Sequence, residues 1–444
     1  MVALALAGCG NSGSASSSGT GGAVGSGGTG GGDVSGAGGT GMADSGQSTG
    51  NGGTRADSGG SGGPNVGAGG AGGAYAGGSQ GSGIAADASS DAPATSDARS
   101  DSTTRDAPSD AARAHDAAND SNIEGGAPGF RIVGRTAPGS VGTRFGWPGV
   151  AFYARFSGTQ ASVQLNDGAF QNSFEVVVDG GTPRKFTTVS GQSAYSLATG
   201  LAAGTHDLVL WRSTEVFDSG VTELLGLDNF GTGGALLSPP AAPDRRIEVV
   251  GDSISVGAGL EGGPAGCAAN KTSSDNYFAY GSVAARAVGA DVVTIAYSGI
   301  GVFRSFNPAD PTMPMRYDRA IPSETAAWDF TKYQPHVVVI NLGTNDFGAG
   351  DPGQPYVDAY VAFVRHIRSG YPGAYFICIA MYGNQETAVG SVVSTLKTGG
   401  ETRIEQLNFN AVQNNLGCAQ HPNAAAQSAM GNLLVTRLRA VMNW

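Results

Sequence analysis

The chain has 444 residues, a formal net charge of −11 and 75 glycines. This acidity, without a basic patch or stripe, argues against nucleic acid as a partner. No apolar run reaches the ~18 residues that span a bilayer. No Cys or His spacing is typical of zinc, so we expect no metal and no other cofactor.

The first nine residues, M-V-A-L-A-L-A-G-C, resemble an apolar signal core that ends in a bacterial lipobox over residues 6–9. The pattern predicts lipidation of Cys9. Gly10 follows the cysteine, which by resemblance to other bacterial lipoproteins favours the outer membrane. We therefore expect an exported protein with a lipid anchor, at the outer membrane or cell surface. A chance apolar stretch is the alternative.

Residues 10–128 change composition twice but show no apolar periodicity. Gly and Ser dominate up to about residue 85, and Asp, Ala, Ser, Thr and Arg follow. Such a segment cannot bury enough apolar surface to offset the entropy lost on ordering. We predict a disordered tether over 10–128. Glycine-rich structural repeats are disfavoured, because the segment has no strict period.

Residues 129–240 have the texture of an all-β domain. A-S-V-Q-L-N (161–166) alternates apolar and polar residues, F-E-V-V-V-D-G-G (174–181) ends in a turn signal, and H-D-L-V-L-W (206–211) follows another turn. Short strands with regular glycine turns predict a β-sandwich of the jelly-roll type. The segment S-P-P-A-A-P-D (238–244) is typical of a stiff linker.

Residues 241–444 alternate continuous apolar strands with amphipathic helices. Such strands are buried on both faces, which predicts an α/β domain with a parallel sheet and helices on both faces. Active sites of such sheets lie at the carboxyl ends of the strands. The predicted strands are 246–253, 291–299, 336–346, 374–381 and 402–409, and the predicted helices are 276–288, 355–368 and a last helix after residue 423.

Ser253 lies where the strand 246–253 turns into a loop, a position that can expose a nucleophilic hydroxyl at the sheet edge. The tripeptide G-D-S alone is a weak signal, since a serine there can equally begin a turn or cap a helix. The G-x-S-x-G elbow does not fit, because Ser255 occupies the position of the second glycine.

Gly299 and Asn345 also follow predicted strands. Acyl transfer builds negative charge on a carbonyl oxygen, and each preorganised N–H donor to it is worth about 3 kcal/mol. A glycine N–H allows close approach, and an asparagine side chain adds a donor without a charge. A turn-forming asparagine before Asp346 explains Asn345 equally well when it is taken alone.

Elimination among the five histidines singles out one candidate for a general base. His115 lies in the predicted tether, His206 in the sandwich, and His336 at the amino end of a strand. His366 falls on the predicted helix 355–368, where a surface position is the default. Only His421, in G-C-A-Q-H-P-N, lies in a late loop beside a strand end. A loop histidine capping the next helix is the alternative.

The four blocks G-D-S-I-S, S-G-I-G-V, L-G-T-N-D and C-x-x-H-P-N resemble those of SGNH (GDSL-type) hydrolases, in family order. The preceding sandwich, with F-S-G-T, V-V-D-G and G-T-H-D-L-V-L-W, resembles the N-terminal domain of carbohydrate esterase family 2. The resemblance covers 129–444. It implies a serine esterase that removes O-acetyl groups from polysaccharides such as xylan or glucomannan. It also implies that Ser253 is the nucleophile and His421 the base, with the Ser253 and Gly299 backbone N–H groups and the Asn345 side chain as oxyanion hole.

The sequence departs from that pattern before His421, where an aspartate often stands. Ala419 and Cys418 offer no carboxylate. We therefore expect a Ser–His dyad in which a backbone carbonyl of Cys418 or Ala419 orients the imidazole. Acids elsewhere in the chain, with Glu261, Asp275 and Glu386 as unranked candidates, could complete a triad instead.

An exported chain permits a disulfide, and two of the remaining cysteines lie in loops of the predicted site. We expect Cys267 and Cys418 to pair. The chain-entropy model allows roughly 4–5 kcal/mol for so long a closed loop. Cys378 lies inside Y-F-I-C-I-A-M and is expected to be a buried core residue.

The substrate surface is less readable. Trp328 could stack on a sugar ring, although a core-filling role is equally compatible with its sequence context. Tyr382 is a second, weaker candidate, and so is Phe303, because both follow strand ends.

Two alternatives remain open. A peptidoglycan or lipid esterase could use the same scaffold. A non-catalytic, surface glycan-binding protein would make the sandwich the functional part, but it would not need all four site residues. In each case we expect a monomer.

Overall fold

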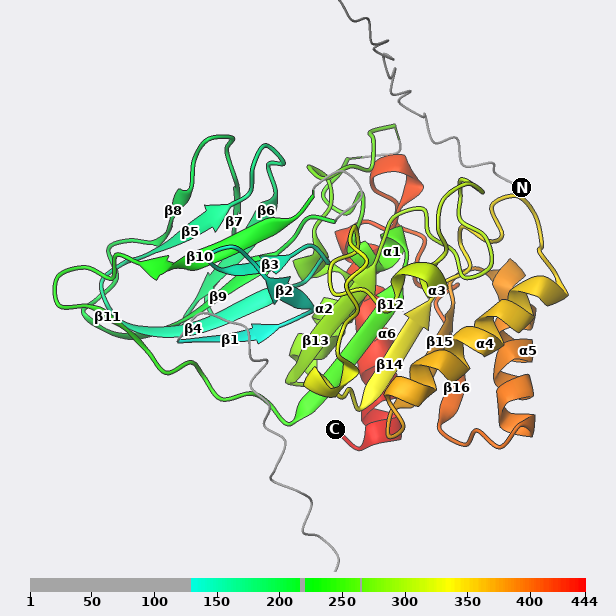
Figure 1. The fold of residues 1–444 in the computed structure, drawn as a ribbon. Coiled ribbons are helices and arrows are strands. Elements are labelled where there is room, and N and C mark those ends of the chain that lie inside the picture. Colours follow the sequence, from blue (N-terminus) through cyan, green and yellow to red (C-terminus); the bar gives the residue numbers. More distant parts are fainter. Residues whose placement is uncertain (1–128, 216–219, 264–265) are drawn as a thin grey trace, which may run out of the picture. The chain divides into compact units, whose positions relative to one another are not determined.

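The computed structural model describes residues 129–215, 220–263 and 266–444 (Figure 1). Cys9 and the segment 10–128, for which lipidation and a tether are predicted, lie outside these residues. Among the helices of these ranges, none is both long enough and apolar enough to cross a membrane.

The first domain consists of antiparallel strands in two sheets (Figure 1). One sheet has the order β1-β4-β9-β6-β7, with β11 paired to β4, and the other has the order β2-β3-β10-β5-β8. The strands are β1 Phe130–Val133, β2 Thr136–Pro138, β3 Thr143–Phe145, β4 Ala151–Gly158, β5 Ala161–Asn166, β6 Ser173–Val178, β7 Arg184–Thr187, β8 Ala194–Ala198, β9 Gly204–Arg212, β10 Thr222–Asp228 and β11 Ala235–Leu237. The predicted all-β domain is confirmed.

Alternation explains why these strands pack as a sandwich. In β5, Ala161, Val163 and Leu165 are buried, whereas the residues between them are at least partly exposed. One face of the strand therefore joins the core and the other meets solvent, as the period of two requires.

The second domain is built on a parallel sheet with the order β13-β12-β14-β15-β16, and the predicted α/β domain is confirmed. Its strands are β12 Arg245–Gly251, β13 Ala290–Ala296, β14 Val337–Asn341, β15 Tyr375–Ala380 and β16 Ile404–Asn408. Its helices are α1 Ser253–Val256, α2 Tyr280–Ala287, α3 Met313–Arg316, α4 Gln354–Gly370, α5 Glu386–Thr398 and α6 Ala424–Met442, with short 3-10 turns η1 Asn276–Phe278, η2 Phe330–Lys332, η3 Gly383–Gln385 and η4 Cys418–Gln420.

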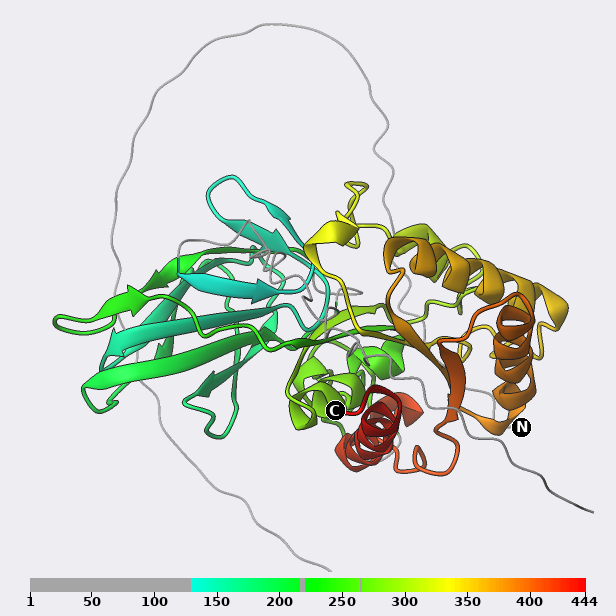
Figure 2. The same cartoon turned by 90° about the horizontal axis from the view of Figure 1, so that it is seen from below.

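Helices cover both faces of this sheet, α2 and α6 on one and α4 and α5 on the other (Figure 2). In β14, Val337 and Val339 belong to the core under α2 and α6, whereas Val338 and Ile340 belong to the core under α4 and α5. A strand buried on both sides needs apolar residues at every position, which is why the sequence reads as a continuous apolar run.

A buried ion pair joins the two domains. Arg135, between β1 and β2, donates to Glu248 of β12 at 3.2 Å, and neither side chain has any exposed surface. The hydroxyl groups of Tyr317 and Tyr371 also donate to the Glu248 carboxylate. With these additional donors the buried charge on Glu248 is fully partnered, as burial of a carboxylate requires.

Candidate active site

The candidate site lies where the strand order reverses. Strand β12 is flanked by β13 and β14, and Gly251 at its carboxyl end pairs with Ala296 and with Asn341. In open α/β sheets, ligands bind at this kind of switch point, outside the carboxyl ends of the strands. Ser253 follows β12 here. Gly299 follows β13 and Asn345 follows β14, so their positions agree with the predicted cluster.

Ser253 is the first residue of the short helix α1. Asp252 caps this helix, since its carboxylate accepts a hydrogen bond of 3.0 Å from the Ile254 N–H. The first N–H groups of a helix have no partner within the helix, so the Ser253 N–H can point at a ligand. The residue is 7% exposed, which leaves the hydroxyl in a largely dry environment.

The His421 ring lies against the serine. Its Nε2 is 2.8 Å from the Ser253 Oγ, although the two residues are 168 positions apart in the sequence. This is the distance at which an imidazole can take a hydroxyl proton.

Helix α6 holds the His421 loop to α1. Asn423 caps the start of α6, since its side chain accepts hydrogen bonds from the Ala425 and Ala426 N–H groups. One turn further, the Gln427 side chain donates to the Ile254 carbonyl at 3.0 Å. The histidine thus enters the site beside a helix that is hydrogen-bonded directly to the helix that begins at Ser253.

Gly299 and Asn345 are linked by the loops that carry them. The Asn345 side-chain amide donates to the Ile300 carbonyl at 2.7 Å, which uses one of its two N–H bonds and leaves the second for a ligand. Gly299 adopts φ +79°, in the region that favours glycine, and a Cβ there would first meet Phe306 at 3.9 Å. The glycine is therefore required by backbone conformation rather than by crowding.

Two acids outside the predicted site fix these loops. Asp346, fully buried, accepts hydrogen bonds from the N–H groups of Val302, Phe303 and Arg304. Glu215 reaches over from the sandwich and accepts from the N–H of Ser298, next to Gly299, at 3.2 Å. Asp346 belongs to the L-G-T-N-D block, which is a sequence signal that could have identified it. Glu215 has no comparable signal.

Burial controls the protonation of the site. It lowers the pKa of His421 below 6.5, although the nearby carbonyls of Cys418 and Ala419 act to raise the pKa. Neither carbonyl completes a hydrogen bond with Nδ1, which has no partner within the described part of the chain. The expected carbonyl acceptors thus lie close to the ring, but the expected hydrogen bond is not formed. Burial also raises the pKa of Asp252 to about 7.

Two of the three acids considered as triad members have other partners. Glu261 pairs with Lys185, and Asp275 accepts from the Tyr277 N–H as the cap of η1. Glu386 begins α5. None of the three has a hydrogen bond to His421 among the residues that the structure describes.

The cysteines are distributed as the sequence suggests. Cys267 and Cys418 form a disulfide across a separation of 151 residues. Cys378 is a free, fully buried thiol in β15, and burial raises its pKa to about 12.

The structure corrects the expectation for Trp328. Its side chain is 5% exposed and belongs to the core, where the Arg135 guanidinium lies 5.9 Å from the ring centre. It cannot stack on a sugar. Tyr382 is half-buried against the core beside α6, and Phe303 is 40% exposed.

One acidic cluster within the described ranges has the proximity of a cation site. Glu175, Glu261 and Asp275 each bring a carboxylate oxygen within 4.8 Å of the others. The Lys185 ammonium lies among them, paired with Glu261 and 3.4 Å from Asp275. The Lys185 ammonium group therefore already offsets part of the negative charge of these three carboxylates.

The fold and the Ser253–His421 contact at the switch point define a GDSL-like hydrolase. A family model described as "GDSL-like Lipase/Acylhydrolase family" matches residues 249–417, and one described as "Carbohydrate esterase 2 N-terminal" matches 132–240. The chain belongs to carbohydrate esterase family 2, a family of carboxylic ester hydrolases.

Individual relatives agree with this assignment. An acetylxylan esterase/glucomannan deacetylase of Cellvibrio japonicus is 30% identical over 69% of this chain and 88% of its own length. The cellulase/esterase CelE of Acetivibrio thermocellus is 33% identical over 68% of this chain, which spans only 38% of that longer protein. A solved family two carbohydrate esterase from Clostridium thermocellum, in complex with cellohexaose, superposes with a TM-score of 0.68 at 32% identity, over 71% of this chain and all of its own.

The depressed pKa of His421 gives a prediction for the pH profile. A general base must be neutral, and burial keeps the imidazole neutral to lower pH. We expect kcat/KM to stay high through pH 6.5 and to fall only at a lower pH, as imidazolium forms. The measurement is kcat/KM for a soluble acetyl ester across the pH range.

Asp252→Asn is the matched control for this profile, because Asp252 also titrates in the site and Asn keeps an oxygen to cap α1. An unchanged acid limb in that variant assigns the limb to His421. A wild-type midpoint above 6.5 would contradict the prediction and indicate a carboxylate on the ring.

Proposed function

We propose that the protein is a carbohydrate O-acetyl esterase that acts on polysaccharides of the xylan or glucomannan type, through a Ser253–His421 dyad. The observation that carries the proposal is the 2.8 Å contact between these side chains at the switch point of the sheet. The relatives named as acetylxylan esterase/glucomannan deacetylase support the substrate class.

In the first half of the reaction, His421 Nε2 takes the proton of Ser253 as Oγ attacks the acetyl carbonyl. The negative charge that develops on the carbonyl oxygen is stabilised by the backbone N–H groups of Ser253 and Gly299 and by the Asn345 side chain. The imidazolium then gives its proton to the sugar oxygen, which leaves as an alcohol. An acetyl group remains on Ser253.

In the second half, His421 takes a proton from water, which attacks the acetyl-serine carbonyl. The same donors stabilise the second oxyanion. Return of the proton to Ser253 Oγ releases acetate and restores the resting site. Every proton transfer passes through His421, so no second acid or base is needed.

Asn345→Ala is expected to lower kcat by roughly 10²-fold or more with little change in KM, because its N–H acts on charge that exists mainly in the transition state. Steady-state kinetics on a short acetyl ester measure this. Since Asn345 also donates to Ile300, the thermal unfolding midpoint of the variant is needed as a control. Wild-type kcat in a folded variant would make Asn345 a turn residue only.

The experiment that tests the substrate class is acetate release by residues 129–444 across acetylated xylan, mannan, peptidoglycan and short p-nitrophenyl esters. Release from the plant polysaccharides above that from the others supports the proposal. Preference for peptidoglycan would favour the alternative esterase. No release from any ester would favour a non-catalytic glycan-binding role.

The same proposal places the enzyme outside the cell, on a lipid anchor at Cys9. The support is the lipobox-like sequence over residues 6–9. Mass spectrometry of the mature native protein should find a lipidated Cys9 as its first residue, and an unmodified Cys9 would refute the anchor.

A further inference from the structure

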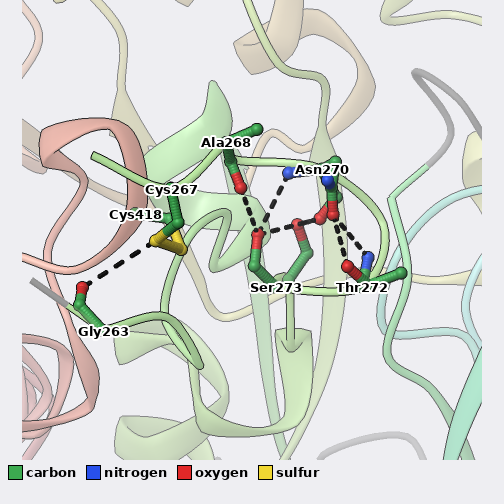
Figure 3. The surroundings of a disulfide bond; sticks show 8 residues. Gly263, Cys267, Ala268, Asn270, Thr272, Ser273 and Cys418 are labelled. Atoms are coloured by element: carbon green, nitrogen blue, oxygen red, sulfur yellow. Dashed lines mark hydrogen bonds between the residues drawn. A yellow bond between two sulfur atoms is a disulfide. The ribbon is translucent and has the colours of Figure 1, made fainter. Parts of the chain in front are cut away.

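The disulfide joins the two segments that bring the proposed catalytic residues together. Figure 3 shows the bond between Cys267 and Cys418. Cys267 lies in the loop that follows α1, and Cys418 lies three residues before His421. Cys418 thus lies in the stretch where a triad would have the acid that orients the histidine. In this chain the residue there is a disulfide-bonded cysteine.

Backbone contacts reinforce this junction. The Cys418 N–H donates to the Gly259 carbonyl at 3.0 Å, and the Ala419 N–H donates to the Cys267 carbonyl at 2.8 Å. A Cβ on Gly259 would lie 2.5 Å from the Cys418 oxygen, and one on Gly262 would lie 1.7 Å from the Cys418 sulfur. The His421 segment therefore packs directly on the backbone that follows the nucleophile helix.

The Cys267 end is itself held in place. The Ser273 hydroxyl donates to the Ala268 carbonyl and accepts from the Asn270 N–H, both at 3.0 Å (Figure 3). The Ser274 hydroxyl donates to the Asn270 carbonyl at 2.7 Å. The disulfide thus ties the His421 segment to a loop with internal hydrogen bonds.

The His421 segment has a conformation that its own residues do not favour. Ala419 and Gln420 have φ of +48° and +60°, a left-handed conformation that costs non-glycine residues roughly 1 kcal/mol or more each. The ring has no acceptor at Nδ1 among the described residues to hold it. Contacts with other parts of the protein must therefore impose this conformation on Ala419 and Gln420.

We propose that the Cys267–Cys418 disulfide is the positioning device for His421, in place of an orienting carboxylate, so that turnover depends on the oxidised state. This inference rests on the proposed Ser253–His421 chemistry. A dithiol reductant supplies two electrons and two protons: the S–S bond breaks, two thiols form, and the reductant becomes a cyclic disulfide. Cys267 is partly exposed, which gives the reductant access.

Dithiothreitol treatment of the folded enzyme is expected to lower kcat on a soluble acetyl ester by about 10²-fold, the loss that a displacement of about 1 Å in a catalytic group can cause. KM should stay within about two-fold, because a displaced base slows the proton transfer rather than substrate binding. Removal of the reductant and reoxidation should restore kcat.

Three controls accompany this test. The Cys267→Ser/Cys418→Ser double variant should show the low kcat permanently and be insensitive to dithiothreitol, whereas Cys378→Ala should respond as wild type does. Circular dichroism before and after reduction reports whether the fold persists.

The outcomes separate the two proposals. An oxidised enzyme without acetate release refutes the proposed function itself. An active enzyme whose kcat is unchanged by complete reduction, verified by thiol counting, refutes the positioning role. A loss of kcat that only follows loss of secondary structure would also refute it, because the disulfide would then contribute stability alone.

Discussion

Replacing Ser253 by alanine is expected to leave under about one per cent of wild-type kcat, because it removes the hydroxyl oxygen that would carry the acetyl group. Ser253 lies on a capped helix terminus with its Oγ 2.8 Å from His421, so the substitution removes the nucleophile without altering the backbone. Acetate release from p-nitrophenyl acetate and from acetylated xylan measures the loss.

Ser255→Ala is the matched control, since it lies on the same short helix but points away from the histidine. Its hydroxyl bonds with that of Tyr280 at 2.8 Å. We expect a cost of about 1 kcal/mol in stability and at least a tenth of wild-type kcat. A Ser253→Ala enzyme as active as this control would rule out Ser253 as the nucleophile.

Replacing His421 by alanine is expected to abolish turnover, with a loss comparable to that of Ser253→Ala. The two residues act as a unit, because removal of the base leaves the serine protonated. Measurement of kcat for the single variants and for the double variant tests this. The double variant should be no worse than either single one.

Neutralising the three candidate acids tests whether one of them completes a triad with His421. Glu261→Gln, Asp275→Asn and Glu386→Gln should each retain most of the kcat, because none of these carboxylates has a hydrogen bond to His421 among the described residues. Asp275→Asn keeps an oxygen that can cap η1, so this variant tests the loss of the negative charge without the loss of the cap. If any of the three lost as much activity as His421→Ala, a triad would replace the dyad.

Much of the fold could be predicted because burial leaves a periodic trace. The strands that became β14 and β15 read as almost unbroken apolar runs, since helices cover both faces of the sheet. Strands β12 and β13 carry Glu248 and Thr294 among their apolar residues. The helix expected over 276–288 is interrupted after Phe278, because Ala279 has extended backbone, and it becomes η1 and α2. Helix α5 was not predicted, although Val389, Val392, Val393 and Leu396 repeat with helical spacing and are all buried.

The positions of the candidate site residues were predictable only where a residue lies just after a strand. Ser253, Gly299 and Asn345 meet that condition, and elimination left His421. Trp328 was misjudged as a possible sugar platform, because what covers it includes Arg135, nearly 200 residues earlier in the chain.

The same limit applies to the supporting contacts. The hydrogen bond from the Ser298 N–H to Glu215 joins the two domains, and no local sequence pattern predicts such a contact. Whether a nearby carbonyl completes a hydrogen bond to His421 Nδ1 depends on small differences in distance and angle, and spacing in a sequence could not show that this bond is not formed among the described residues.

The buried pair of Arg135 and Glu248 has a consequence for how such enzymes can evolve. A catalytic domain inherited without its sandwich would keep Glu248 and its two tyrosine donors but lose the guanidinium, and removing one partner of a buried ion pair costs about 3–5 kcal/mol. That is a large fraction of the stability of an ordinary domain. Recombination therefore cannot exchange the sandwich freely. In this it differs from a glycan-binding module that is attached by a flexible linker. The two domains should therefore be inherited together. In natural gene fusions, we expect the boundary to lie before the sandwich rather than between the sandwich and the catalytic domain.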